Sequence, residues 1–396
     1  MRIVGIICEY NPFHLGHQKQ FDMIRRSEGP DCGIVCLMSG NFVQRGHPAI
    51  LHKSLRAQAA VECGADLVLE LPLTACLSSA EGFAAGGVKI LGDFCEKLCF
   101  GAEDADAQNL LNTARALLSP DFPPALRAEL DKGLSFPVAR AAALKKMGMD
   151  SEILSTPNNI LAVEYCKAIL GQGCAMEPMP IHRVGDYHDD RPDLENPSAT
   201  AVRQLMWNAY DWKSCIPEPA QGIFEGATLH ALSAGERAIL YRLRTMAEEE
   251  FEVLPHGSEG LWRKLMHASR SCATLEEIAC AVKSKRYTRT RIDRMILCAF
   301  LGLTAQDLAA SAPYSRVLAF NDFGRNILNQ TRNYGIFPNI GEKIDHTYQM
   351  IEDRADALYS LFAEHSPTAP DCKPRVFYRA CRIILHSAGY SDIMQI

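Results

Sequence analysis

The sequence predicts an α/β protein, in which a Rossmann-like parallel sheet is followed by a C-terminal all-helical domain. Two observations predict this class. Short, continuous apolar runs alternate with helical patterns through the first hundred residues, and the pattern from about residue 225 onward is almost wholly helical. Continuous apolar strands are typical of a parallel sheet that helices cover on both faces, and such sheets bind ligands beyond the carboxyl ends of their strands.

The expected elements of the sheet domain follow in chain order. Strands are predicted at residues 2–8, 33–38, 67–71, 97–100 and 179–184. Helices are predicted at 16–26, 54–63, 80–91 and about 157–170, and a further helix begins near residue 198 behind a proline. Apolar periodicity and start signals place these helices, so the first hundred residues alternate as β-α-β-α-β-α-β.

The chain is expected to form two domains. Residues 104–150 are predicted to be a helical insertion with breaks at Pro120, Pro123 and Pro124, so the sheet domain should span residues 1–215. The second domain, residues 225–396, should hold helices at 229–250, 257–269, 274–282, 288–300 and 344–362. No internal repeat of 20 to 50 residues is visible.

Composition indicates a globular protein of the cytoplasm. The 396 residues are 47% hydrophobic and 22% charged, and the 15 cysteines are scattered without a Cys-x-x-Cys pair. This usage favours reduced thiols over disulfides or a zinc site. The N-terminal apolar run is too short for a signal peptide, and no run of eighteen apolar residues follows, so no membrane contact is expected. The net charge of −6 disfavours a protein that coats nucleic acid, although a local basic patch can still bind RNA.

The most informative motif is His14-Leu15-Gly16-His17, which follows the apolar run from Ile3 to Cys8. The first turn of a helix behind a buried strand offers unpaired N–H groups and the positive end of the helix dipole, which suit a polyphosphate. Two histidines on one face of this turn can donate to oxygens that gain charge in a transition state. Structural histidines and a metal site are the alternatives.

Two further segments predict polar contacts near the same edge of the sheet. Ser198, Thr200 and Arg203 place hydroxyls and a cation on the first turns of a helix, where they can surround phosphates, although a serine before a helix is most often an N-cap. The loop at 39–46 follows the second strand at its carboxyl end. It could hold a second substrate or be an ordinary surface loop.

The fourth segment, residues 283–294, is strongly basic and holds one aromatic residue and one anion. Such density suits phosphate contacts along an RNA backbone, with the aromatic ring available to stack on a base. A solvated helix face is the common alternative, but the anions that usually intersperse such a face are missing here. The candidate RNA-binding residues are Lys283, Lys285, Arg286, Tyr287, Arg289, Arg291 and Arg294.

Together these motifs resemble the bacterial tRNA(Met) cytidine acetate ligases, which are similar to HxGH nucleotidyltransferases. The resemblance runs through most of the chain. The matching pieces are Gly5 to His17, Ser39 to Gly46, Leu69 to Pro72, Phe100 to Glu103, Pro157 to Ile160, Ser198 to Arg203 and Lys285 to Arg291. A bare adenylyltransferase would share the first piece and the Ser/Thr-Arg motif, but not the basic helix.

The resemblance implies that ATP and acetate react to acetyl-adenylate and pyrophosphate, and that the acetyl group then passes to N4 of the wobble cytidine of elongator tRNA(Met). It implies that His14 and His17 stabilise charge at the α-phosphorus and that Mg²⁺ accompanies ATP, with no zinc. It also implies single ATP contacts at Gly101, at Asn158 or its neighbour Asn159, and at Arg183. The implied ATP loop comprises Ile7, Cys8, Glu9, Tyr10, Asn11, Pro12, Phe13, His14, Leu15, Gly16, His17, Gln18, Lys19 and Gln20.

Two other functions stay open at this point. An adenylyltransferase acting on a small-molecule phosphate substrate would use the same phosphate motifs, and its helical domain would cover the site or mediate oligomerisation. A non-catalytic RNA-binding adaptor would keep the ATP fold without its chemistry. The sequence shows neither the acetate pocket nor a general base for acetyl transfer.

Overall fold

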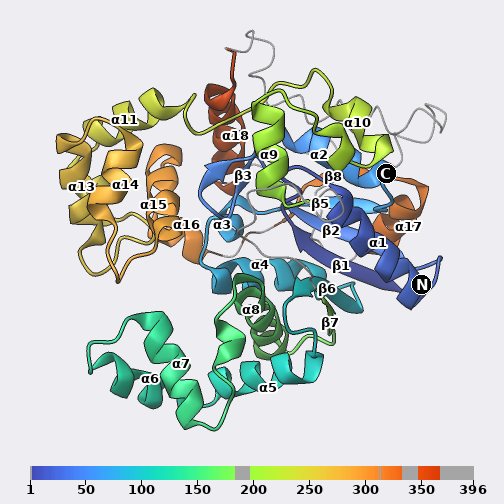
Figure 1. Cartoon of the computed structure of the whole chain (residues 1–396), viewed down its shortest axis with the longest axis horizontal. Coiled ribbons are helices and arrows are strands. Elements are labelled where there is room, and N and C mark those ends of the chain that lie inside the picture. Colours follow the sequence, from blue (N-terminus) through green and yellow to red (C-terminus); the bar gives the residue numbers. More distant parts are fainter. Residues whose placement is uncertain (1, 183–196, 311, 313, 332–346, 366–396) are drawn as a thin grey trace.

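The computed structural model describes residues 2–182, 197–310, 312, 314–331 and 347–365. Its centre is a six-stranded sheet in the order β7-β6-β1-β2-β5-β8, and a two-stranded hairpin lies beside it (Figure 1). The strands are β1 (Ile3–Cys8), β2 (Gly33–Ser39), β3 (Phe42–Val43), β4 (His47–Pro48), β5 (Leu67–Leu71), β6 (Lys97–Ala102), β7 (Glu177–His182) and β8 (Val317–Phe320).

The predicted parallel sheet is confirmed. β1 pairs in parallel with both β2 and β6, and the sheet continues in parallel to β5 on one side and to β7 on the other. The chain therefore builds outward from β1 in two directions, so β1 and β6 flank the point where the strand order reverses. In open α/β sheets, ligands bind beyond the carboxyl ends of the strands at this point.

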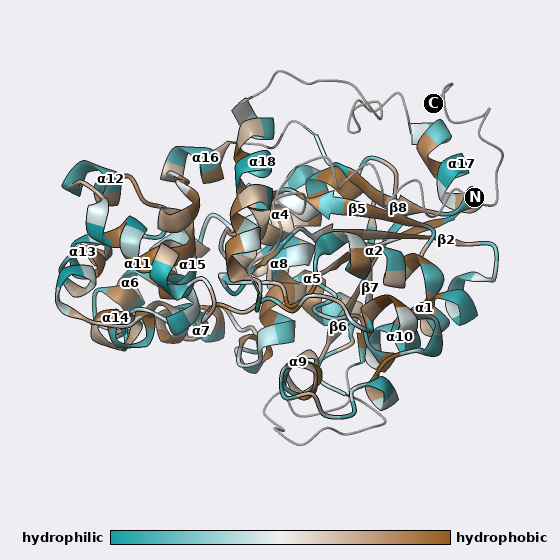
Figure 2. Cartoon of the chain, turned by 90° about the horizontal axis from the view of Figure 1, so that it is seen from above, coloured by the Kyte–Doolittle hydropathy of each residue, from teal (hydrophilic) through white to brown (hydrophobic). Residues whose placement is uncertain are grey.

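Helices cover both faces of the sheet, because its strands carry apolar side chains on both sides. One apolar cluster joins Ile7, Leu69 and Phe100 to α4 (Ala80–Leu91) and α8 (Pro157–Gln172). The other face carries Ile6 and Cys36 against α1 (Leu15–Glu28) and α2 (Lys53–Glu62). Figure 2 shows brown strands inside and teal sides of the helices outside. This burial is the main source of the sheet's stability.

The remaining helices form two groups beside the sheet (Figure 1). One group lies in the predicted insertion: α5 (Ala107–Leu118), α6 (Phe122–Leu130), α7 (Phe136–Lys146) and the short η1 (Glu152–Leu154). The other group contains α11 (Glu236–Thr245), α12 (Glu248–Glu252), α13 (Leu261–Ser271), α14 (Leu275–Val282), α15 (Arg289–Leu301) and α16 (Ala305–Ala309). The other helices are α3 (Leu73–Cys76), α9 (Ala199–Trp207), η2 (Lys213–Cys215), α10 (Glu218–Phe224), α17 (Asp322–Thr331), α18 (Thr347–Tyr359) and η4 (Ser360–Phe362).

The chain returns to the sheet after the second group of helices, which the sequence does not predict. β8 pairs with β5 in antiparallel fashion, and α17 adds Ile327 to the apolar cluster on one face. Four apolar residues of β8 give a weak sequence signal, because a short apolar run fits a strand and a buried helical segment equally well. The segment predicted to lie in the helical domain thus supplies an edge strand of the sheet.

A buried ionic network holds α18 against this returning segment. Lys53 Nζ lies 2.8 Å from the Glu70 carboxylate and 2.6 Å from that of Asp356, and Arg316 Nε lies 2.8 Å from Glu70. Arg316 also pairs with Glu352. Because buried charges are costly unless they are paired, these contacts fix α18 at the carboxyl end of β5.

Candidate functional site

The two histidines of the first motif cap the helix that they open. His14 is the N-cap of α1, and its Nδ1 accepts a hydrogen bond from the Gly16 N–H at 3.1 Å. His17 Nδ1 in turn accepts from the His14 N–H at 3.2 Å, and the two rings stack with centroids 3.8 Å apart. An Nδ1 that accepts carries no proton, so each neutral ring keeps its proton on Nε2. Both rings are thereby prepared as Nε2–H donors.

Gly16 makes room for the ring that folds back over the helix start. A Cβ at this position would lie 2.9 Å from Cε1 of His14 and 3.1 Å from its Nδ1. Real Cβ atoms do not approach other atoms so closely, so a side chain here would force the His14 ring to move. The glycine is therefore a requirement of the histidine geometry.

The helix α9 brings the second predicted phosphate motif to the same loop. Arg203 Nη1 donates to the carbonyl oxygen of Asn11 at 2.7 Å, and Nη2 donates to the Thr200 hydroxyl at 3.0 Å. Ser198 caps α9, because its hydroxyl accepts from the Ala201 N–H. Two helix N-termini and an arginine therefore converge, although 192 positions separate Asn11 from Arg203.

A third helix start lies at the end of β6. The Glu103 carboxylate accepts hydrogen bonds from the Thr156 hydroxyl, from Asn158 Nδ2 and from the Asn159 N–H, at 2.7 to 2.9 Å. Burial acts to raise the pKa of Glu103, but these donors outweigh it and the pKa is lowered, so the carboxylate stays ionised. Asn159 is buried and accepts from the Asp104 N–H, whereas Asn158 is half-buried.

The other predicted ATP contacts lie in β6, outside the described residues, or in the loop itself, where their burial differs. Gly101 lies within β6, paired with Ile181 of β7, and Arg183 lies outside the described residues. Gln20 donates from Nε2 to the Cys99 thiol at 3.4 Å, which joins α1 to β6. In the loop, the buried residues are Ile7, Tyr10, Asn11, Pro12, Phe13 and His14, the half-buried ones are Cys8, Glu9, Leu15, Gly16, His17, Gln18 and Gln20, and Lys19 is exposed.

The loop after β2 forms the β3–β4 hairpin, which is anchored to the predicted ATP loop at two places. The Gln44 N–H donates to the Glu9 carboxylate, and the Ile50 N–H donates to Asn11 Oδ1, each at 2.8 Å. Arg56 of α2 ties the hairpin and the predicted ATP loop together. Its guanidinium is fully buried and donates to the carbonyl oxygens of Leu51 and Glu9, among others.

The sequence does not single out Arg56, because an arginine within a helix usually faces solvent. Its only sequence signal is its position among Ala57, Ala59 and Ala60, small residues that let the helix lie close to the sheet. Glu103 is likewise not among the predicted site residues, although it ends the Phe100 to Glu103 motif.

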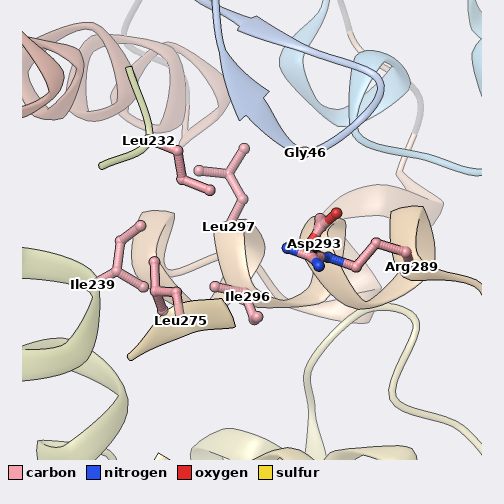
Figure 3. Close-up of a pocket in the computed structure, with 8 residues that line it drawn as sticks. All are labelled: Gly46, Leu232, Ile239, Leu275, Arg289, Asp293, Ile296 and Leu297. Carbon is pink, nitrogen blue, oxygen red and sulfur yellow. Dashed lines mark hydrogen bonds and ion pairs between the residues drawn. The ribbon is translucent and has the colours of Figure 1, made fainter. Parts of the chain in front are cut away.

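The hairpin tip presses on the backbone of α15, the helix of the basic segment. Gly46 has a φ of +83°, and a Cβ there would lie 2.5 Å from the backbone nitrogen of Arg294. Arg294 Nη1 donates to the Gln44 carbonyl oxygen at 3.3 Å. Figure 3 shows Gly46 above α15, beside a small pocket with the apolar side chains of Leu232, Ile239, Leu275, Ile296 and Leu297, and with Asp293 and Arg289 at one side.

In the folded chain, arginines of the basic segment form ion pairs with carboxylates. Arg286 pairs with Glu259 at 2.6 Å, and Arg289 pairs with Glu276 at 2.7 Å and with Asp293 at 2.8 Å. The hydrogen bond from Arg289 lowers the pKa of Glu276 to about 2. Within this segment, Lys283 and Lys285 are exposed, whereas Arg289, Arg291 and Arg294 are partly buried. The exposed positive charge is thus smaller than the sequence suggests.

The expectation that Tyr287 stacks on an RNA base is wrong for this structure. The residue is only 4% exposed, and its hydroxyl donates to the Glu259 carbonyl oxygen at 3.3 Å. Lys264 and Arg291 lie over the ring at 5.5 and 5.1 Å from its centroid. The ring packs into the core of the helical group, because an aromatic side chain gains more from burial than from exposure.

Two findings on the described residues concern metal ions and membranes. No group of three or more His, Cys, Asp or Glu side chains within the described ranges could hold a metal ion. None of the helices in this part of the chain is both long and apolar enough to cross a membrane.

The chain is similar to known proteins along most of its length. The model of the HIGH Nucleotidyl Transferase family matches residues 1–371. A tRNA(Met) cytidine acetate ligase of Acetivibrio thermocellus is 34% identical over 365 residues, covering 85% of this chain and 87% of the relative. One of Alkaliphilus metalliredigens is 36% identical over 406 residues, covering 92% and 95%.

Solved structures agree with this similarity. The apo crystal structure of Thermotoga maritima TmcAL superposes with a TM-score of 0.85 at 29% identity, covering 94% of this chain and 96% of that one. The structure of the same protein bound with alpha-thio ATP gives a TM-score of 0.83 at 29% identity, with 96% and 98% coverage.

Proposed function

This chain belongs to the HIGH nucleotidyl transferase family and to its tRNA(Met) cytidine acetate ligases, and on that premise we propose that it acetylates tRNA in two steps. ATP and acetate first form acetyl-adenylate and pyrophosphate. The acetyl group then passes to N4 of the wobble cytidine of elongator tRNA(Met), giving N4-acetylcytidine. A tRNA substrate is consistent with the expected location in the cytoplasm.

The observation that carries the proposal is the convergence of the starts of α1 and α9 on one loop. His14 and His17 offer Nε2–H donors there, and Arg203 closes the loop onto α9. Helix N-termini and an arginine favour a polyphosphate, and donors aimed at the α-phosphate stabilise the charge that develops when acetate attacks. The ATP analogue bound by the Thermotoga maritima relative supports this assignment.

The predicted ATP contacts beyond this loop belong to the same proposal. We assign Asn158 rather than Asn159, because Asn159 is buried and its side-chain oxygen already accepts from Asp104. Mg²⁺ is expected to arrive with ATP.

The helical group is proposed to bind the tRNA. The exposed Lys283 and Lys285 and the partly exposed arginines of α15 supply positive charge, which attracts phosphates without reading sequence.

An aromatic amine such as cytidine N4 is a poor nucleophile. Activation of acetate as a mixed anhydride with a good leaving group is therefore the physical reason to spend ATP.

The test is to incubate the protein with ATP, labelled acetate and total tRNA, and to search the RNA for N4-acetylcytidine by nucleoside mass spectrometry. We expect label in elongator tRNA(Met). Pyrophosphate exchange without acetylcytidine would instead favour an adenylyltransferase with a small-molecule substrate. Absence of both reactions would favour an RNA-binding adaptor.

Two variants divide the steps. His17→Ala should abolish acetate-dependent pyrophosphate exchange, because it removes a donor to the reacting phosphate. Arg289→Ala should spare this exchange but weaken tRNA binding and reduce its dependence on salt. Equal loss in both assays for Arg289→Ala would contradict a separate RNA surface.

A further inference from the structure

We propose that His47, oriented by Asp293, is the general base that removes the proton from cytidine N4 during acetyl transfer. This inference rests on the proposed function and adds a catalytic residue to it. His47 opens β4, and Asp293 lies on α15. The two residues come from the sheet domain and the helical group respectively, and the pair forms only where these two parts meet.

The hairpin holds His47 next to the predicted ATP loop. Gln44 and Ile50, which lie three residues before and after His47, donate backbone hydrogen bonds to Glu9 and Asn11 of that loop, both at 2.8 Å. Because each anchor is only three positions from His47, the hairpin cannot extend far from this loop. His47 therefore lies close to the predicted ATP site, where the acyl group would be activated.

The same hairpin holds His47 against the helix that carries the basic segment. The Gly46 backbone touches that of Arg294 and Asp293, as the close approach at the hairpin tip requires (Figure 3). Arg294 Nη1 also donates to the Gln44 carbonyl oxygen. A tRNA bound on the helical group would thus present its base beside His47, where the two substrates have to meet.

The imidazole has the environment of a base rather than of a core histidine. Its side chain is 43% exposed, while the Asp293 side chain is 8% exposed, and His47 Nε2 lies 3.5 Å from Asp293 Oδ2. Nε2 is buried and has no hydrogen-bond partner in the described part of the chain. A buried carboxylate at this distance favours the Nε2–H tautomer, which leaves Nδ1 as the proton acceptor.

The charges around the pair suit this role. Asp293 and Arg294 face the hairpin from α15, and Arg289 neutralises part of the Asp293 charge through a 2.8 Å contact. The Glu9 carboxylate contacts the hairpin by accepting from the Gln44 N–H. The aspartate is therefore shared between two cations when His47 is protonated. His47 Nε2 and the Asp293 carboxylate are in ion-pair contact at 3.5 Å without a hydrogen bond, and contacts of a catalytic pair are often loose without substrate and tighten when it binds.

The step balances without another reactant. The N4 atom of cytidine forms a bond to the acetyl carbonyl carbon of acetyl-adenylate, and the bond from this carbon to the phosphate oxygen breaks. AMP leaves with the electron pair of that bond. The N4 proton passes to Nδ1 of His47, and the imidazolium that forms is stabilised by Asp293 before it returns the proton to water.

The experiment measures acetyl transfer in a single turnover, with saturating tRNA added to enzyme that already holds labelled acetyl-adenylate. For His47→Gln, we expect acetate-dependent pyrophosphate exchange and tRNA affinity to stay near the wild-type values. The transfer rate should fall on the order of 100-fold, the lower range for loss of a general base. Added imidazole should restore part of the transfer rate in His47→Ala, and Asp293→Asn should slow transfer without stopping exchange.

The matched control is His267→Gln, because His267 is an exposed histidine on α13 and lies outside both predicted sites. It should keep wild-type rates in both steps. A wild-type transfer rate in His47→Gln would overturn the proposal, and so would a loss confined to tRNA affinity or a loss that imidazole never rescues. Failure of the wild-type protein itself to form acetylcytidine would refute the proposed function, which the variants do not test.

Discussion

His14 and Gly16 are matched to one another: the histidine ring accepts from the glycine N–H, and any Cβ at position 16 would lie 2.9 Å from the ring. The helix cap and the proposed catalytic donor are thus the same side chain. A residue that improves the helix can therefore damage the site.

Gly16→Ala should separate stability from activity. Alanine favours a helix by up to about 1 kcal/mol relative to glycine, but here its methyl group displaces the His14 ring. We expect unfolding free energy to stay near the wild-type value and kcat/KM for ATP in pyrophosphate exchange to fall at least tenfold. Gly171→Ala is the control, because Gly171 lies in α8 with open space around its Cα. Equal activity of both variants would contradict the packing argument.

Arg203→Lys should weaken ATP use, although the charge is retained. Arg203 reaches the Asn11 carbonyl and the Thr200 hydroxyl at the same time, and an ammonium group cannot reproduce this fork. Loss of one charge-assisted hydrogen bond costs about 1.5 to 3 kcal/mol, so kcat/KM for ATP should fall roughly 10- to 100-fold. Steady-state exchange kinetics measure this. Arg237→Lys, on the exposed side of α11, should change nothing.

Gly46→Ala should impair acetyl transfer more than acetate activation. The substitution adds a methyl group against the α15 backbone and strains a residue with a φ of +83°. The sequence offers a matched control in Gly133, which has the same φ of +83° and nothing within 4 Å of its Cβ. Gly133→Ala measures the conformational strain alone, so only Gly46→Ala should lower the single-turnover transfer rate.

Three half-buried histidines should make the protein less stable in mild acid. Burial lowers the pKa of His52 to about 3 and those of His230 and His256 to about 4. Because the unfolded chain binds these protons at about pH 6.5, stability should rise with pH between about 4 and 6.5 and level off above. The unfolding free energy, measured in denaturant at several pH values, gives the slope. His230→Gln should reduce the slope by about one proton, and an unchanged slope would contradict the assignment.

Local sequence patterns were sufficient for the elements around the proposed phosphate site. The apolar run of β1, the start of α1 at His14 and the cap of α9 at Ser198 depend on residues within one or two turns. Hydrophobic periodicity and capping act at this range, so the parallel sheet and the position of the first motif were predictable. The short strand β8 was not, because four apolar residues carry no unambiguous period.

Tertiary structure decided which charged and aromatic side chains are available. The 12-residue basic segment has a single internal anion, yet Glu259 and Glu276 neutralise two of its arginines, and Tyr287 turns into the core. The His47–Asp293 pair joins positions 246 apart in the sequence, counted from 47 to 293. The sequence by itself determined the local elements and the position of the His14–His17 motif, since these follow from neighbouring residues. Pairing across the junction depends on how the packed parts meet, which only the folded chain decides.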